Sequence, residues 1–126
     1  MSAPDSIGVD YLAQGESYKP RFKVRNRTTN AVVDLTVSGV TLSYRLALNG
    51  SVVTTRTSGQ SGEYSYATDG TDGDVTFLFA PATTAAFSAG TYTVELVYTG
   101  TAPTPDDKIV LARGTLVVAP PTTGTI

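Results

Sequence analysis

The segment "VTLSYRLALNGSVVTTRT", residues 40–57, decides the fold class of this chain. Apolar side chains occupy every second position of its first half, which is typical of a strand with one buried face. These residues are Val40, Leu42, Tyr44, Leu46 and Leu48. Asn49 and Gly50 follow at once, and a second strand-like run begins at Ser51. Because both turn residues tolerate positive φ, an Asn-Gly pair between two such runs predicts a β-hairpin.

The same two-residue period continues through most of the chain. Strands are expected at 6–12, 17–26, 40–48, 51–57, 63–68, 75–80, 91–100 and 108–119, with a short extended piece at 31–39. A helical turn fits only 81–90, where Pro81 opens it and Gly90 closes it. Short strands with frequent turn signals indicate an all-β fold, an antiparallel immunoglobulin-like β-sandwich of about 7–9 strands.

The phrase "FSAGTYTV", residues 87–94, fits one corner of such a sandwich. In immunoglobulin-like domains a Tyr near the start of this strand donates a hydrogen bond back to the preceding loop, and Tyr92 is the candidate. Val94 stands where an antibody domain carries its second Cys. The chain has no Cys, so apolar packing alone is expected to hold the sheets together.

Composition excludes several classes of function. The chain has 126 residues, enough for one domain, and contains neither His nor Cys. A Ser-His-Asp triad, a Cys-His dyad and an ordinary zinc site are therefore impossible. The Glu residues, Glu16, Glu63 and Glu95, lie on different strands or strand edges, so the sequence places no carboxylate pair across a cleft. We expect a protein that is not an enzyme and needs no cofactor or metal.

Residues 1–14 are expected to form an N-terminal arm and first strand, 15–119 the sandwich, and 120–126 an extended C-terminal tail. The first 14 residues lack the basic and then apolar pattern of a secretion signal. No apolar run approaches the ~20 residues of a membrane span. We therefore expect synthesis in the cytoplasm and no membrane partner.

A row of basic residues is the main candidate site. Lys19, Arg21, Lys23, Arg25 and Arg27 alternate along one strand and make up five of the 9 basic residues in a chain of net charge -2. Because strand side chains alternate between faces, all five should point outward while Tyr18, Phe22 and Val24 point inward. Pro20 cannot donate a ladder hydrogen bond and so favours an edge or strand-start position.

Three interpretations of this row remain open. The first is a solvated edge whose charges discourage aggregation, and the second is a surface that docks on an acidic protein. The third is nucleic-acid binding, which the overall acidity and the lack of aromatic side chains on the basic face oppose. We predict Lys19, Arg21, Lys23, Arg25 and Arg27 as partner-binding residues, with no nucleic acid as partner.

Two smaller clusters have alternative interpretations. Asp69, Asp72 and Asp74 in "DGTDGD" are a possible oxygen-ligand site for Ca²⁺, although Asp-Gly pairs are ordinary turn sequence. Tyr64 and Tyr66 share a face of one short strand and can form either a ligand-binding platform or a packed pair.

Two long stretches resemble a known family. They are "GESYKPRFKV…NAVVDLTVSGVTLSYRL" (15–46) and "SAGTYTVELVY…DDKIVLARGTLVV" (88–118). Both resemble the immunoglobulin-like N-terminal module of bacteriophage baseplate upper proteins and related tail or virion proteins. The "DLTG" element of that family is two residues longer here, running from Asp34 to Gly39.

The resemblance implies a non-enzymatic bacteriophage virion structural protein. It would be an accessory module on the tail, baseplate or capsid surface, held in many copies by contacts with other virion proteins. The alternative is a carbohydrate- or receptor-binding β-sandwich module, since one fold hosts many functions. A hydrolase is the weakest hypothesis, because the residue types it needs are missing or scattered.

Overall fold

The computed structural model describes residues 5–26, 29–100 and 110–121. These contain strands β1 (Asp5–Ala13), β2 (Arg21–Lys23), β3 (Leu42–Leu48), β4 (Ser51–Thr57), β5 (Tyr64–Tyr66), β6 (Asp74–Phe77), β7 (Gly90–Tyr98) and β8 (Val110–Ala119), and helix α1 (Pro81–Ala85). The ends of the predicted arm and tail, 1–4 and 122–126, lie outside the described residues.

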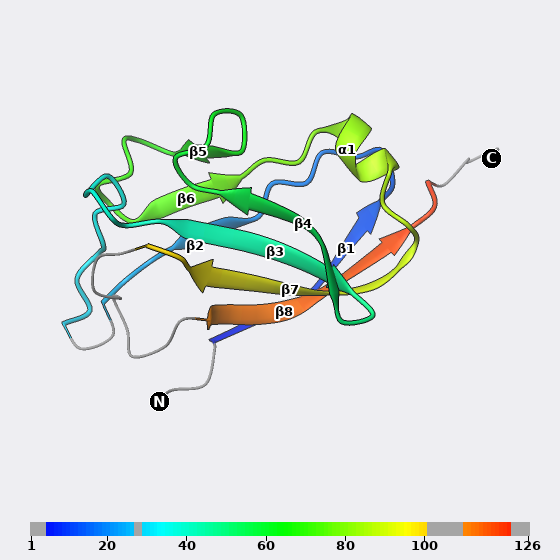
Figure 1. The fold of residues 1–126 in the computed structure, drawn as a ribbon, viewed down its shortest axis with the longest axis horizontal. Helices are drawn as coiled ribbons and strands as arrows, with labels where there is room; N and C mark the ends of the chain where they lie inside the picture. Colours follow the sequence, from blue (N-terminus) through cyan, green and yellow to red (C-terminus); the bar gives the residue numbers. More distant parts are fainter. Residues whose placement is uncertain (1–4, 27–28, 101–109, 122–126) are drawn as a thin grey trace.

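The strands form two sheets. One has the order β1-β8-β7-β3-β4 and the other β2-β6-β5 (Figure 1). Buried side chains from both sheets make one hydrophobic cluster, so the sheets are the two layers of a β-sandwich. The predicted all-β sandwich is confirmed, and its strand order corresponds to an immunoglobulin-like domain in which β8, β7 and β3 form the three-stranded GFC core, with β1 added on one side and β4 on the other. The antiparallel prediction has one exception, because β1 pairs with β8 in parallel.

The predicted Asn-Gly hairpin is confirmed. β3 and β4 pair in antiparallel fashion up to Leu48 and Ser51, leaving Asn49 and Gly50 as the turn. Their φ angles are 53° and 82°, the positive values that a two-residue hairpin of this hand requires. The register shifts between the pairs Leu46–Thr54 and Ala47–Val52, so Val53 is an extra residue on β4.

The predicted strand at 17–26 is shorter than expected. Only Arg21–Lys23 forms a continuous ladder, while Tyr18 and Arg25 make isolated bridges to Phe79 and Val32. Pro20 explains the interruption. Its carbonyl accepts a hydrogen bond from the Phe77 N–H, but proline has no backbone N–H to donate in return.

Two other segments differ from the sequence-based expectation. Residues 31–39 form turns and one bridge rather than a strand, although the Leu35 N–H donates to the Gly70 carbonyl. The predicted helical turn is limited to α1, and Gly90 begins β7 instead of closing a helix. The Gly90 φ of 154° is a value that L side chains rarely adopt, which explains why a glycine stands at this strand start.

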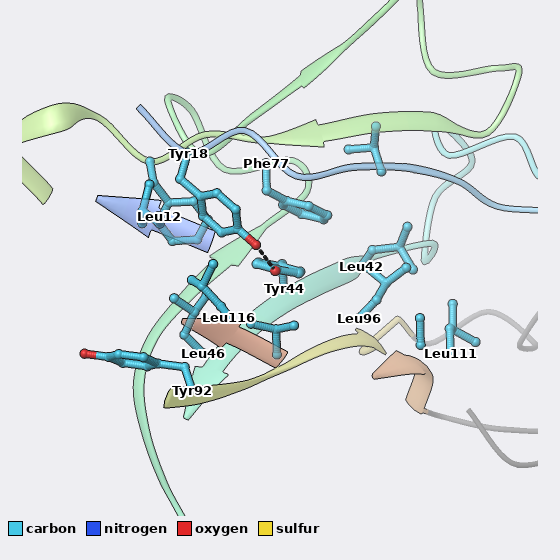
Figure 2. Close-up of a cluster of buried hydrophobic side chains, with 14 of the residues drawn as sticks. Leu12, Tyr18, Leu42, Tyr44, Leu46, Phe77, Tyr92, Leu96, Leu111 and Leu116 are labelled. Carbon is cyan, nitrogen blue, oxygen red and sulfur yellow. Dashed lines mark hydrogen bonds between the residues drawn. The ribbon is translucent and has the colours of Figure 1, made fainter. Parts of the chain in front are cut away.

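Aromatic side chains fill the centre of the sandwich. Tyr18, Tyr44 and Phe77 meet between the layers, and the Tyr18 and Tyr44 hydroxyls lie 2.5 Å apart (Figure 2). Burial raises the pKa of Tyr18 to about 12 and also raises the pKa of Tyr44. Both hydroxyls therefore stay protonated at neutral pH, so one donates to the other. Phe77 stacks on Tyr44 with ring centroids 5.8 Å apart.

The tyrosine corner predicted at Tyr92 is present. The Tyr92 hydroxyl donates to the Ser88 carbonyl at 2.6 Å, which ties the start of β7 to the loop before it. Val94, two residues on, is almost fully buried. An apolar side chain thus occupies the position of the antibody Cys, as the absence of cysteine requires.

The tyrosine pair can be tested by a double-mutant cycle. Y44F removes one hydroxyl and leaves that of Tyr18 buried without its partner, so we expect the free energy of unfolding to fall by about 1–3 kcal/mol. In Y18F/Y44F both polar groups are gone, and the cost should be less than the sum of the two single changes. Urea unfolding measures the free energy of unfolding of each variant. Y11F is the control, because the Tyr11 side chain is 75% exposed. Additive losses would contradict a coupled pair.

Candidate functional site

The basic residues lie on the outer face of the three-stranded sheet. Lys19, Arg21, Lys23 and Arg25 are exposed, and we call these four residues the basic row. The residues between them point the other way: Tyr18 and Val24 are buried, and Phe22 is half-buried against the core. Arg27, the fifth predicted partner-binding residue, lies outside the described residues.

Arg21 differs from its neighbours because it has an ionic partner. Its Nε donates to Asp74 Oδ1 at 2.8 Å, and its Nη2 donates to Asp74 Oδ2 at 2.5 Å. The Asp74 side chain is only 7% exposed, against 62% for Arg21. The hydrogen bonds from Arg21 lower the pKa of Asp74 and keep its carboxylate charged. Arg21 therefore has a structural role that the sequence did not indicate.

The other cations of the row are more available. Lys19 and Lys23 form no ion pair among the residues that the structure describes. Arg25 donates from Nη1 to the Asn30 carbonyl at 3.1 Å, an exposed contact that leaves its charge unneutralised. Three cations can thus meet a partner without breaking an internal ion pair.

The backbone of this segment is open on one side. In the part of the chain that the structure describes, β2 is an edge strand whose one neighbour in the sheet is β6. The Tyr18 N–H donates to Phe79 and the Val24 N–H donates to Gly73, so these residues turn their backbone groups toward the β6 side. Since successive residues of a strand alternate, the backbone groups of the basic row point the opposite way. We call this side, from Lys19 to Arg25, the open edge.

Pro20 does not obstruct the open edge. Its carbonyl accepts from Phe77, which places its backbone groups on the β6 side. The edge position predicted from Pro20 is confirmed, yet the proline blocks pairing only on the side that is already occupied. Side-chain charge is then the feature that discourages a further strand from adding here.

A hollow of about 350 Å³ lies between β2 and the opposite sheet. Its apolar lining comes from Ile7, Phe22, Val24, Leu96, Leu111 and Ala112, and Asp5, Ser6, Arg21, Lys23 and Arg25 complete it. The result is an apolar floor with a mainly basic rim. Sequence reasoning missed this hollow because its walls come from β1, β2, β7 and β8, which only the fold brings together.

The aspartates of "DGTDGD" do not converge. Asp69 Oδ1 accepts from both the N–H and the hydroxyl of Thr71, and these hydrogen bonds lower the pKa of Asp69. Asp72 accepts from the Asp74 N–H, and Asp74 itself pairs with Arg21. Within the described ranges no group of three or more potential ligands could hold a metal ion. The segment is organised by turn hydrogen bonds and one ion pair.

The glutamates are likewise separate. Glu16 accepts from the Ala13 N–H, Glu63 accepts from the Thr57 N–H, and Glu95 pairs with Arg113 across β7 and β8. Each carboxylate therefore has a partner of its own elsewhere in the fold.

Tyr64 and Tyr66 form a packed pair. Their ring centroids are 4.9 Å apart in an edge-to-face arrangement, and both rings pack against the core. One side of the Tyr66 ring rests on Gly70, where an added Cβ would lie 2.6 Å from the ring. Both tyrosines also line a second hollow, of about 390 Å³, beside Leu35–Thr41. Tyr66 is thus largely used by packing, while Tyr64 borders a space that could hold a small ligand.

No helix in the described part of the chain is long and apolar enough to cross a membrane.

Comparison with known proteins finds a likeness among solved structures. No protein-family model and no curated protein matches the chain. Among solved structures, extracellular domains 3–5 of Drosophila OTK align with a TM-score of 0.38 and 18% identity. The match covers 94% of this chain and 34% of that one. The fold assignment made above rests on the sheet order and the tyrosine corner.

The structural role of Arg21 gives a stability test. R21E would place a second carboxylate against the nearly buried Asp74, so we expect the melting temperature to fall by roughly 3–6 °C. K19E reverses an exposed charge of the same row that has no ion pair in the described residues, and should change the melting temperature little. Differential scanning calorimetry compares the two variants. Equal melting temperatures would contradict a structural role for Arg21.

Proposed function

We propose that this chain is a non-enzymatic accessory structural module of a bacteriophage virion, attached to the particle by protein–protein contacts. The observation that carries the attachment is the basic row, an exposed line of cations along an edge strand. The virion assignment is supported by the resemblance of residues 15–46 and 88–118 to modules of phage baseplate upper proteins.

The charge distribution supports a protein partner. The chain has a sequence pI of about 4.8, yet four of its 9 basic residues lie along one edge strand, so positive charge is concentrated on that side of an acidic molecule. Complementary charges mainly set orientation and association rate, and suppress incorrect partners. Each contact can be weak, since copies repeated on a regular particle bind together with a much higher effective affinity.

Particle attachment can be tested with charge-matched variants. K19Q/K23Q/R25Q removes the three cations of the basic row that have no ion pair within the described ranges, and we expect attachment to particles to weaken by about tenfold or more. S51E/Q60E/S61E changes the net charge equally at exposed positions outside the basic row, and should attach normally. Co-sedimentation with purified particles of the phage that encodes the chain measures both variants. Attachment should also weaken with rising salt concentration.

Two results would contradict the proposal. One is that mass spectrometry finds the protein absent from purified particles. The other is that both triple variants attach as well as the unmodified chain.

The hollow beside Tyr64 favours a second candidate, a carbohydrate- or receptor-binding module. Its lining includes hydroxyl side chains such as Thr36 and Ser38 next to an aromatic ring, a combination suited to a sugar. On a glycan array we expect any specific signal to be lost in Y64A and kept in Y11A, which truncates an exposed tyrosine elsewhere. An empty array, or equal binding by both variants, would contradict this candidate.

A further inference from the structure

The open edge carries unpaired backbone groups beside its cations. Neither the N–H nor the carbonyl of Lys19, Arg21 or Lys23 takes part in a backbone hydrogen bond toward that side among the described residues. Such an edge is a template for one more strand, and proteins use it to bind extended peptides. The basic row and the hollow together determine what kind of peptide fits.

The outer side chains of an added strand would face the basic row. Residues directly opposite each other in a strand pair point to the same face of the sheet. Peptide residues opposite Arg21, Lys23 and Arg25 would therefore stand beside these cations, spaced by ~6.6–6.8 Å along the strand. Acidic side chains at every second position match this arrangement.

The inner side chains of the same strand would face the hollow. Residues between the acidic positions point toward the opposite sheet, above the lining formed by Ile7, Leu96 and Leu111. Burial of apolar surface there is favourable, whereas a charged group would lose hydration without an evident partner. The alternate positions should therefore be apolar.

A second copy of this chain fits the open edge poorly. Pairing β2 with β2 would bring two basic rows together, and like charges directly opposite each other are destabilising. An acidic partner removes that repulsion and replaces it with attraction.

We propose that the open edge of β2 accepts an extended segment of another virion protein as an added strand, with acidic and apolar residues in alternation. This rests on the proposed function, since it specifies the partner of the same basic row. The segment extends the three-stranded sheet, its carboxylates pair with Lys19, Lys23 and Arg25, and its apolar side chains enter the hollow.

The probe for this proposal is an acetylated and amidated heptapeptide of alternating Glu and Val. If the peptide runs antiparallel to β2 with its Glu residues opposite the basic row, the Glu N–H groups point to β2 and the Val N–H groups point away. A peptide N-methylated at Glu loses those hydrogen bonds, while a peptide N-methylated at Val keeps them and is the matched control. We expect the first to bind at least about tenfold more weakly than the second, measured by NMR titration of the whole chain.

Hydrogen exchange gives an independent readout. The amides of Lys19, Arg21 and Lys23 should exchange more slowly when the unmodified peptide is bound, because each gains an acceptor. The K19Q/K23Q/R25Q variant should bind the peptide more weakly than S51E/Q60E/S61E. Both results together support strand addition.

The opposing outcomes separate this inference from the proposed function. Equal binding of the two methylated peptides, or unchanged exchange at all three amides, would overturn strand addition. So would failure of the unmodified peptide to bind at millimolar concentration. If K19Q/K23Q/R25Q still weakens co-sedimentation with particles, the proposed function stands even though strand addition is overturned. If it attaches as well as the unmodified chain, the proposed function is overturned as well.

Discussion

The contact between Tyr18 and Tyr44 is the constraint on which the rest of this sandwich depends. The chain has no disulfide to join its sheets, and these two hydroxyls meet between the layers instead. Phe22, Phe77 and Phe79 surround them with ring centroids 5.5–6.2 Å apart. Aromatic side chains supply large buried area and geometric preference together, so a small cluster of them can fix how two sheets pack.

This packing also creates the basic row. Tyr18 must point inward to reach Tyr44, and Phe22 and Val24 follow it inward at strand spacing. The residues between them are then forced outward, whatever their chemistry. The same alternation turns their backbone groups toward the open edge, because Tyr18 and Val24 use theirs on the β6 side. In this segment, packing of the core side chains therefore also places the cations on the surface.

The basic row combines two requirements that often conflict. An edge strand needs charge to discourage uncontrolled pairing, and a binding edge needs accessible backbone to accept a chosen partner. In the proposed strand addition, positive charge meets both requirements, since it repels another copy and would attract an acidic strand. Arg21 is less available to a partner, because it forms an ion pair with Asp74, whose nearly buried carboxylate needs a positive neighbour.

Local sequence determined those features that depend on neighbouring residues. The Asn49–Gly50 hairpin, the alternation at 17–26 and the tyrosine corner at Tyr92 are all present in the structure, because turn chemistry and strand periodicity act over a few positions. Tertiary structure alone decided the pairing of Arg21 with Asp74, the parallel placement of β1 on β8, and the hollow between the sheets. Each of these joins residues far apart in the chain, and a strand pattern specifies which face a residue takes but not which strand lies opposite it.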